Sequence, residues 1–137
     1  MKAWAKYLHA NRTPGRRIER RGRADGSAVM AIEQVAVLGV GMHPWGKWGR
    51  NFVEYGVAAA RDALADAGID WRDVGFVAGA DTMRNGYPGY VAGATFAQAL
   101  GWTGIPVTSA YGACASGAMA LDAARQRILS GMCDVAL

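Results

Sequence analysis

The chain has 137 residues, of which 52% are hydrophobic, and 19 of them are glycine. This length and composition fit one soluble α/β domain with close contacts between helices and sheet. No stretch reaches the roughly 18 consecutive apolar residues of a membrane span, and no apolar segment with a cleavage site opens the chain, so we expect a cytoplasmic protein.

The formal net charge of +4 is unevenly divided along the sequence. Residues 1–28 hold eight Lys and Arg against two acidic residues, whereas residues 29–137 hold seven Lys and Arg against nine Asp and Glu. A basic arm of this kind would suit nucleic acid, an anionic surface or a targeting peptide. We instead expect residues 1–29 to be a disordered extension, or an extension that precedes a natural start at Met30. From Met30 the sequence Met-Ala-Ile-Glu-Gln leads into an apolar strand. The predicted folded domain is residues 30–137, with no nucleic-acid partner.

From Met30 onward the sequence alternates between strand and helix patterns. Apolar runs predict strands at residues 35–40, 74–80, 105–110 and 134–137, with helices between them at residues 51–67, 90–100 and 115–130. This βαβαβαβ order predicts an α/β fold, a mostly parallel sheet with right-handed crossovers and helices on both faces. Active residues then collect at the carboxyl ends of the strands.

The first predicted helix has the clearest boundaries. Asn51 offers an N-cap side chain, and Glu54 follows at capping-box spacing. Gly68 ends the helix. Between them an apolar stripe runs at helical spacing through Val53, Val57, Ala60, Leu64 and Ala67.

Cys114 is the main candidate for a functional residue. It lies in Tyr-Gly-Ala-Cys-Ala-Ser-Gly-Ala, between the strand ending at Ala110 and a helix marked by apolar residues at positions 118, 121, 124 and 128. Unpaired backbone N–H groups and the positive end of the helix dipole would favour its nucleophilic thiolate form. The alternative is an ordinary buried thiol, because free cysteine is among the most buried residue types. The small residues on both sides, which leave room for an acyl group, favour the nucleophile.

The segment around Cys114 resembles the nucleophile segment of the thiolase superfamily. Residues 106–137 read as a strand, Cys-Ala-Ser-Gly, a helix with a basic turn, and Ser-Gly-Met-Cys-Asp-Val-Ala-Leu opening the next strand. Residues 37–50 resemble the family's first strand and its Pro-x-Gly-Lys loop, and residues 83–100 its glycine-rich dimer loop and second helix. The resemblance covers about residues 32–137. It is closest to the sterol-carrier and lipid-transfer branch, which includes actinobacterial proteins of steroid side-chain degradation.

The resemblance implies a thiolase-like N-terminal half, truncated, from an acyltransferase that acts on CoA thioesters. Its reaction would be thiolysis of a 3-oxoacyl-CoA in lipid or sterol side-chain metabolism, with Cys114 as nucleophile. Coenzyme A would be a substrate, the acyl group fatty or steroid, and no cofactor would be bound. The full-length form would be a homodimer or would have a partner subunit. Because the family's catalytic His residues and second Cys lie in a further, homologous half, we expect residues 1–137 alone to be inactive.

Four further residues are candidates for substrate binding. In thiolase-like dimers the loop matching residues 81–90 reaches toward the partner's pocket, so Met83, Tyr87 and Tyr90 would line an apolar acyl or sterol site; the alternative is surface packing. Tyr111 stands where many thiolases have Asn. That departure leaves room for retro-aldol cleavage of a steroid side-chain hydroxyacyl-CoA, and a non-catalytic lipid-transfer or acyl-CoA-binding module is a third alternative. Because Cys114 is retained, acyl transfer is preferred.

Weaker signals carry ordinary explanations. Gly39-Val40-Gly41 resembles half of a dinucleotide fingerprint, but Pro44 replaces the third glycine, so we expect a tight turn. His43 is expected to be a loop residue without catalytic role. Cys133 is expected to be a core thiol, about 28 Å from Cys114 and too far for a disulfide. With two histidines and no Cys-x-x-Cys, we expect no metal site.

Overall fold

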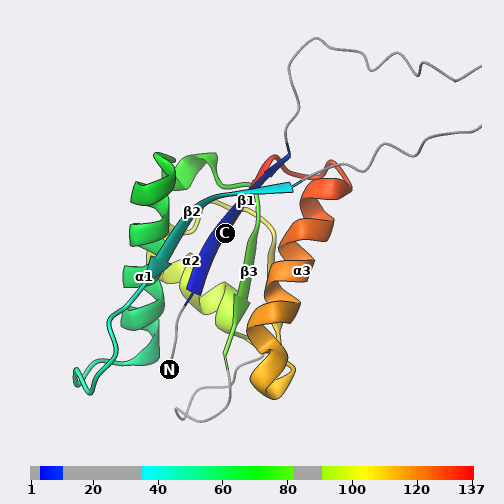
Figure 1. The fold of residues 1–137 in the computed structure, drawn as a ribbon. Coiled ribbons are helices and arrows are strands. Elements are labelled where there is room, and N and C mark those ends of the chain that lie inside the picture. The colour runs from blue at the N-terminus through cyan, green and yellow to red at the C-terminus, as the bar shows by residue number, and fades with distance from the viewer. Residues whose placement is uncertain (1–3, 11–34, 82–90) are drawn as a thin grey trace, which may run out of the picture.

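The computed structural model describes residues 4–10, 35–81 and 91–137, and for residues 4–10 it describes the backbone alone. Strands and helices alternate along most of the described chain (Figure 1). In order they are β1 (Trp4–Ala10), β2 (Val35–Met42), α1 (Phe52–Ala67), β3 (Val77–Ala80), α2 (Ala92–Gly101), β4 (Val107–Ala110), α3 (Ser116–Leu129) and β5 (Val135–Ala136). Short 3₁₀ turns cover Trp71–Asp73 and Ala113–Ala115.

The strands lie side by side in the order β4-β3-β5-β1-β2. β3 and β4 are parallel, with Ala80 opposite Ala110. A parallel bridge between Phe76 and Ala136 joins β3 to β5, and the N–H of Leu137 donates to the carbonyl of Phe76 at 2.9 Å. β1 is antiparallel to both β5 and β2. Consequently β2, β3, β4 and β5 all run in one direction, and β1 alone opposes them.

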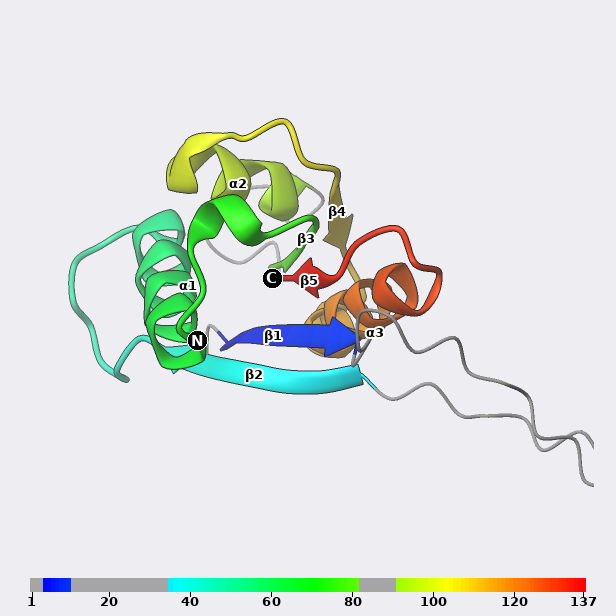
Figure 2. The ribbon, with the colours of Figure 1, turned by 90° about the horizontal axis from the view of Figure 1, so that it is seen from above.

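Helices cover both faces of this sheet. Seen from above, α1 and α2 lie on one side of the strands and α3 lies on the other (Figure 2). The predicted α/β class, with a parallel sheet between helices, is confirmed. β3 is shorter than the strand predicted at residues 74–80, but Gly75 and Phe76 before it already pair with β5.

Residues 4–10 differ from the sequence expectation of a disordered extension, because their backbone forms β1. Between β2 and β5 the backbone N–H and C=O groups need partners, and an antiparallel strand supplies them. The expectation rested on charge, which does not decide backbone pairing. The division into an extension over residues 1–29 and a domain over residues 30–137 stays a prediction.

α1 packs very closely against β2. As predicted, Asn51 caps the helix: its Oδ1 accepts from the N–H of Glu54 at 3.0 Å, and Gly68 ends the helix with φ of 66°. A Cβ placed on Gly41 would lie 2.5 Å from the backbone nitrogen of Ala63, and none fits on Gly39 either. Glycines in β2 therefore set the distance between helix and sheet. The Asp66 carboxylate of α1 accepts from the N–H of Val40 at 2.9 Å and so occupies part of the edge of β2.

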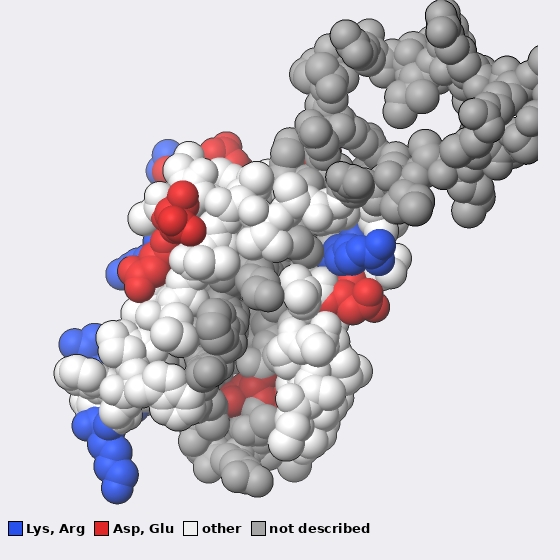
Figure 3. Space-filling view, in the orientation of Figure 1, with Lys and Arg blue, Asp and Glu red and all other residues white. Residues whose placement is uncertain are grey.

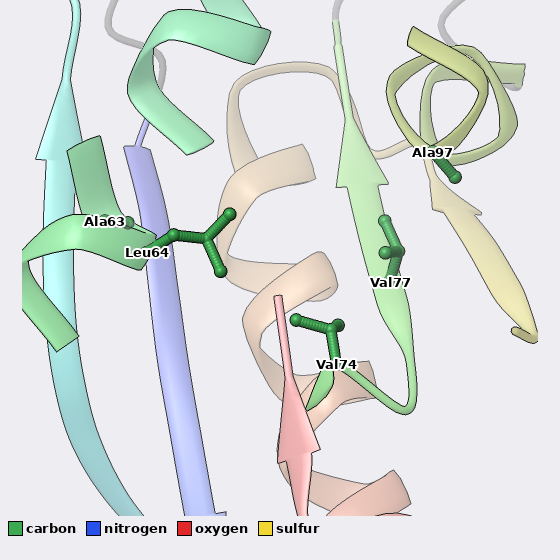
Figure 4. Close-up of a cluster of buried hydrophobic side chains, with 5 residues drawn as sticks. All are labelled: Ala63, Leu64, Val74, Val77 and Ala97. Atoms are coloured by element: carbon green, nitrogen blue, oxygen red, sulfur yellow. The ribbon is translucent and has the colours of Figure 1, made fainter. Parts of the chain in front are cut away.

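Two apolar clusters form the core. The first lies between the sheet and the helices α1 and α2 (Figure 4) and contains Ala63, Leu64, Val74, Val77 and Ala97. The second lies under α3 and contains Phe76, Ala124, Ile128 and Ala136. Of the predicted α3 stripe, Ala124 and Ile128 are buried but Ala118 is exposed, because the buried face of α3 runs through Ser116, Ala120, Ala124 and Ile128.

One face of β2 carries apolar side chains that are not covered. Gly39 and Gly41 face α1, so the alternate residues Leu38, Val40 and Met42 point to the opposite face, where they are 38%, 49% and 38% exposed. Within the described residues, no helix is both long enough and apolar enough to cross a bilayer.

Candidate functional site

Cys114 stands at the carboxyl end of β4, on the connection to α3. It is the middle residue of the 3₁₀ turn Ala113–Ala115, and α3 begins two residues later at Ser116. Its side chain is exposed and makes no disulfide. The thiol thus lies just before the helix rather than on its first turn, at the edge where the parallel strands end.

Ser116 fixes the conformation of this turn. Its hydroxyl accepts from the N–H of Gly112 at 2.9 Å and donates to the carbonyl of Ala113 at 2.7 Å. The side chain is only 4% exposed. Ala113 has φ of 49°, a left-handed conformation found at no other non-glycine residue of the described chain. The hydrogen bonds on both sides hold this strained residue, and with it Cys114, in one geometry.

The surface beside Cys114 is apolar and open. A Cβ on Gly112 would collide with the sulfur of Met119, whereas a Cβ on Gly117 would meet no atom within 4 Å. Tyr111 and Met119 are 45% and 47% exposed. The backbone at Gly117, three residues after Cys114, therefore leaves open space at the start of α3.

The neighbouring strand contributes a buried carboxylate at the same edge. Asp81 follows Ala80, which pairs with Ala110, so Asp81 and Tyr111 leave the sheet at equivalent positions. Asp81 is only 7% exposed. The predicted lining residues Met83, Tyr87 and Tyr90 lie outside the described residues, so their role stays a prediction, as does that of Tyr111.

The comparisons with known proteins agree on one family. Residues 75–137, from the lead-in to β3 through β5, match the family model "Beta-ketoacyl synthase, N-terminal domain". Sterol carrier protein 2 of Gallus gallus is 36% identical over 122 residues, which cover 82% of this chain and 20% of that protein. An acetyl-CoA acetyltransferase of Methanocaldococcus jannaschii is 33% identical over 117 residues, covering 77% of this chain and 28% of that protein. The benzoylsuccinyl-CoA thiolase subunit BbsB of Thauera aromatica is 34% identical over 110 residues, covering 79% and 28%.

The chain belongs to the thiolase superfamily. The predicted resemblance, including its sterol-carrier branch, is confirmed. The chain spans about a fifth of the length of the sterol carrier proteins that it matches. In this thiolase-like chain the Cys-Ala-Ser-Gly motif is the turn described above, with Cys114 exposed and Ser116 buried beneath it.

The second cysteine of this thiolase-like chain has a different environment. Cys133 follows α3 and is half-buried beside the cluster of Phe76, Ala124, Ile128 and Ala136. Burial raises the pKa of its thiol, an effect that the Arg127 charge opposes and the Asp134 charge reinforces. Cys133 is therefore a thiol at the edge of the core, as predicted.

The weaker candidates have structural roles. Nδ1 of His43 lies 2.9 Å from the carbonyl oxygen of Pro44, and its ring packs edge-on against Tyr55. The prediction of a tight turn at Gly39-Val40-Gly41 is wrong, because these residues continue β2. Their missing side chains allow the backbone of α1 to approach the strand closely. Among the described residues, no three His, Cys, Asp or Glu side chains are placed to hold a metal ion.

Sequence reasoning missed Ser116 and Asp81 as members of the site. A serine two residues after the candidate nucleophile is a signal for a side chain that closes a turn onto the backbone. The signal for Asp81 was its position directly after a predicted strand, at the edge where Cys114 also lies.

Proposed function

We propose that Cys114 is the nucleophile of an acyltransferase that acts on CoA thioesters, by thiolysis of a 3-oxoacyl-CoA. The main support is the exposed thiol at the carboxyl end of β4, on a turn that Ser116 fixes. A surface nucleophile on a rigid turn can be approached by a large substrate without rearrangement of the backbone. The open side above Gly117 supplies room for the acyl chain.

The reaction has two steps. The Cys114 thiolate attacks the 3-oxo carbonyl carbon, and the bond between carbons 2 and 3 then breaks. Its electron pair leaves with the CoA thioester fragment as an enolate, which takes up a proton, while the shortened acyl group stays on sulfur. The thiol of free CoA attacks this acyl group, its proton passes to a base, and Cys114 is released as thiolate. Coenzyme A is thus a substrate, and the proposal requires no bound cofactor.

The backbone and further groups share the catalytic work. The N–H of Cys114 is one candidate donor to the oxyanion that forms when sulfur attacks. A base for the thiol and an acid for the enolate are also required, and we assign neither to a residue of this chain. We therefore expect residues 1–137 to be inactive alone and to work within a longer protein, as a homodimer or with a partner subunit. The name of the Thauera relative identifies that protein as a subunit.

Two other functions can be distinguished from thiolysis by experiment. Tyr111 stands at the end of β4 where many thiolases have Asn, and this departure supports retro-aldol cleavage of a steroid side-chain hydroxyacyl-CoA as second candidate. That reaction forms no acyl-enzyme. The name of the sterol carrier relatives suggests a third, an acyl-CoA-binding or lipid-transfer module without catalysis. The proposal covers both a fatty acyl group and a steroid acyl group.

The test compares the two cysteines of one protein. Iodoacetamide at pH 7 should label Cys114 at least 10-fold faster than Cys133, because Cys114 is exposed and burial raises the pKa of Cys133. Mass spectrometry of the labelled peptides measures the two rates. Equal rates would argue for the non-catalytic module.

A second experiment separates the two reactions. In the longer protein that contains this chain, Cys114→Ala should abolish cleavage of a 3-oxoacyl-CoA, with Cys133→Ala as the matched control that keeps it. A Cys114→Ala protein that still cleaves a β-hydroxyacyl-CoA would establish the aldolase instead.

A further inference from the structure

The loop between β2 and α1, residues 43–50, presents two indole rings to solvent. Trp45 is 61% exposed and Trp48 is 55% exposed. Tryptophan carries a large apolar surface, and exposed apolar surface of this size marks a candidate binding site. The loop leaves β2 at its carboxyl end. The start of α3, which follows Cys114, lies at that same lower end of the sheet (Figure 1).

The loop is held in place by contacts of its own residues. The indole N–H of Trp48 donates to the carbonyl oxygen of Pro44 at 3.1 Å, and the ring of His43 packs edge-on against Trp48 with centroids 5.9 Å apart. The N–H of Arg50 donates to the hydroxyl of Tyr55 on α1 at 3.2 Å. Gly46 has φ of 147°, and a Cβ there would lie 2.7 Å from Nε1 of Trp48. Trp48 is therefore positioned before any ligand arrives.

The loop is also positively charged. Lys47 and Arg50 lie within it, and the sequence from residue 35 to residue 53 contains no Asp or Glu. Glu54 lies 3.8 Å from Arg50, but both side chains are more than half exposed, so this pair neutralises the loop only weakly. Figure 3 shows basic side chains standing out at the lower left of this face, where Figure 1 draws the loop.

We propose that residues 43–50 bind the nucleotide end of the CoA substrate. The proposal rests on the function proposed above and extends it to a second part of the same substrate. Adenine would stack on the indole faces of Trp45 and Trp48, and the phosphates would contact Lys47 and Arg50. Exposed aromatic planes beside cations are the chemistry that recognises a nucleotide. The loop and the start of α3 lie at the same end of the sheet, so one extended CoA ester would be able to contact both.

A nucleotide fits these observations better than an anionic membrane does. Two cations attract an anionic lipid surface only weakly. In addition, a rigid loop with an internally bonded indole N–H offers ring faces rather than donors for lipid headgroups.

The experiment titrates the 137-residue chain with adenosine 3′-phosphate 5′-diphosphate, which lacks the thiol and the pantetheine arm. Binding is followed by calorimetry and by quenching of tryptophan fluorescence. Trp48→Ala and Trp45→Ala should each weaken binding about 10-fold, and Trp48→Phe should keep most of it, because a smaller aromatic plane remains. Lys47→Gln should weaken binding and make it less sensitive to salt. Trp102→Ala is the matched control, since Trp102 is 52% exposed after α2, and it should leave the affinity unchanged.

Several results would overturn the proposal. The first is that the nucleotide shows no saturable binding, and the second is that Trp102→Ala loses as much nucleotide affinity as Trp48→Ala. The third is that inorganic diphosphate binds as tightly as the nucleotide and that Trp48→Ala does not change its affinity. Binding to phosphatidylserine vesicles that requires Trp45 and Trp48, without nucleotide binding, would assign the loop to a membrane. Circular dichroism checks that each variant folds. The rate of Cys114 alkylation is a separate measurement, so failure of the loop proposal leaves the proposed nucleophile standing.

Discussion

The hydroxyl of Ser116 donates to the carbonyl oxygen of Ala113 across a distance of 2.7 Å, and so joins the first residue of α3 to the strained residue before Cys114. The same oxygen accepts from the N–H of Gly112. One buried side chain therefore supplies partners to two backbone groups on the turn, and the position of the thiol depends on it.

Ser116→Ala should lower the free energy of unfolding by about 1–2 kcal/mol, because two part-buried hydrogen bonds to the backbone are lost. The rate of Cys114 alkylation should change as well, since Ala113 is no longer held at positive φ. Chemical denaturation and peptide mass spectrometry measure the two effects.

Ser130→Ala is the control for this variant. Ser130 also donates to a backbone carbonyl, that of Arg127 at 2.8 Å, but it is exposed after the other end of α3. Its loss should cost less than about 0.5 kcal/mol and leave alkylation of Cys114 unchanged. If both variants behave alike, Ser116 has no special role in positioning the thiol.

Gly41→Ala should destabilise the protein by about 1–3 kcal/mol, because the added methyl would lie 2.5 Å from the backbone nitrogen of Ala63 and would push α1 from the sheet. Gly117→Ala, in contrast, adds its methyl to open space near the start of α3 and should raise stability by up to about 1 kcal/mol through helix propensity. Urea unfolding of both variants checks the opposite signs; a tolerated Gly41→Ala would contradict the close packing.

The sequence predicted those parts of the fold that local chemistry determines. Asn51 and Gly68 bound α1 as expected, since a cap and a left-handed glycine act within a few residues. The apolar runs predicted β3, β4 and β5, which pair in parallel, whereas β2 is apolar although one of its faces is uncovered. The connection that carries Cys114 was predicted from the change between the apolar strand ending at Ala110 and the helical spacing that follows it.

Contacts between residues far apart in the sequence could not be predicted from such local patterns. Whether residues 4–10 pair with β2 and β5 depends on which backbone groups elsewhere lack partners, and charge is silent on that. Ala118 has the helical spacing of a core residue, but it is exposed because the buried face of α3 instead carries Ser116 and Ala120. The place of Asp81 beside the turn likewise depends on the register between β3 and β4.

Asn51→Ala should lower stability by about 1 kcal/mol, because the N–H of Glu54 loses the side-chain oxygen 3.0 Å away. Asn51→Asp is the matched control, since an Asp side chain caps equally well. Thermal unfolding of both variants measures the difference. A melting temperature for Asn51→Ala equal to that of Asn51→Asp would show that the cap contributes nothing.

The raised pKa of Cys133 predicts a loss of stability in alkali. The folded protein keeps the thiol proton to a higher pH than the unfolded chain does, because burial disfavours the thiolate. Above the ordinary value of 9.0, the folded state then binds more protons than the unfolded state, so the free energy of unfolding falls as the pH rises. Below that value the thiol is protonated in both states and contributes no slope.

Cys133→Ala removes this titration while keeping the Cβ that packs near Gly75. Urea denaturation at pH 8 and at pH 10 should therefore show a smaller alkaline loss in Cys133→Ala than in the unaltered chain. An identical pH dependence in both proteins would mean that burial of Cys133 does not perturb its ionisation.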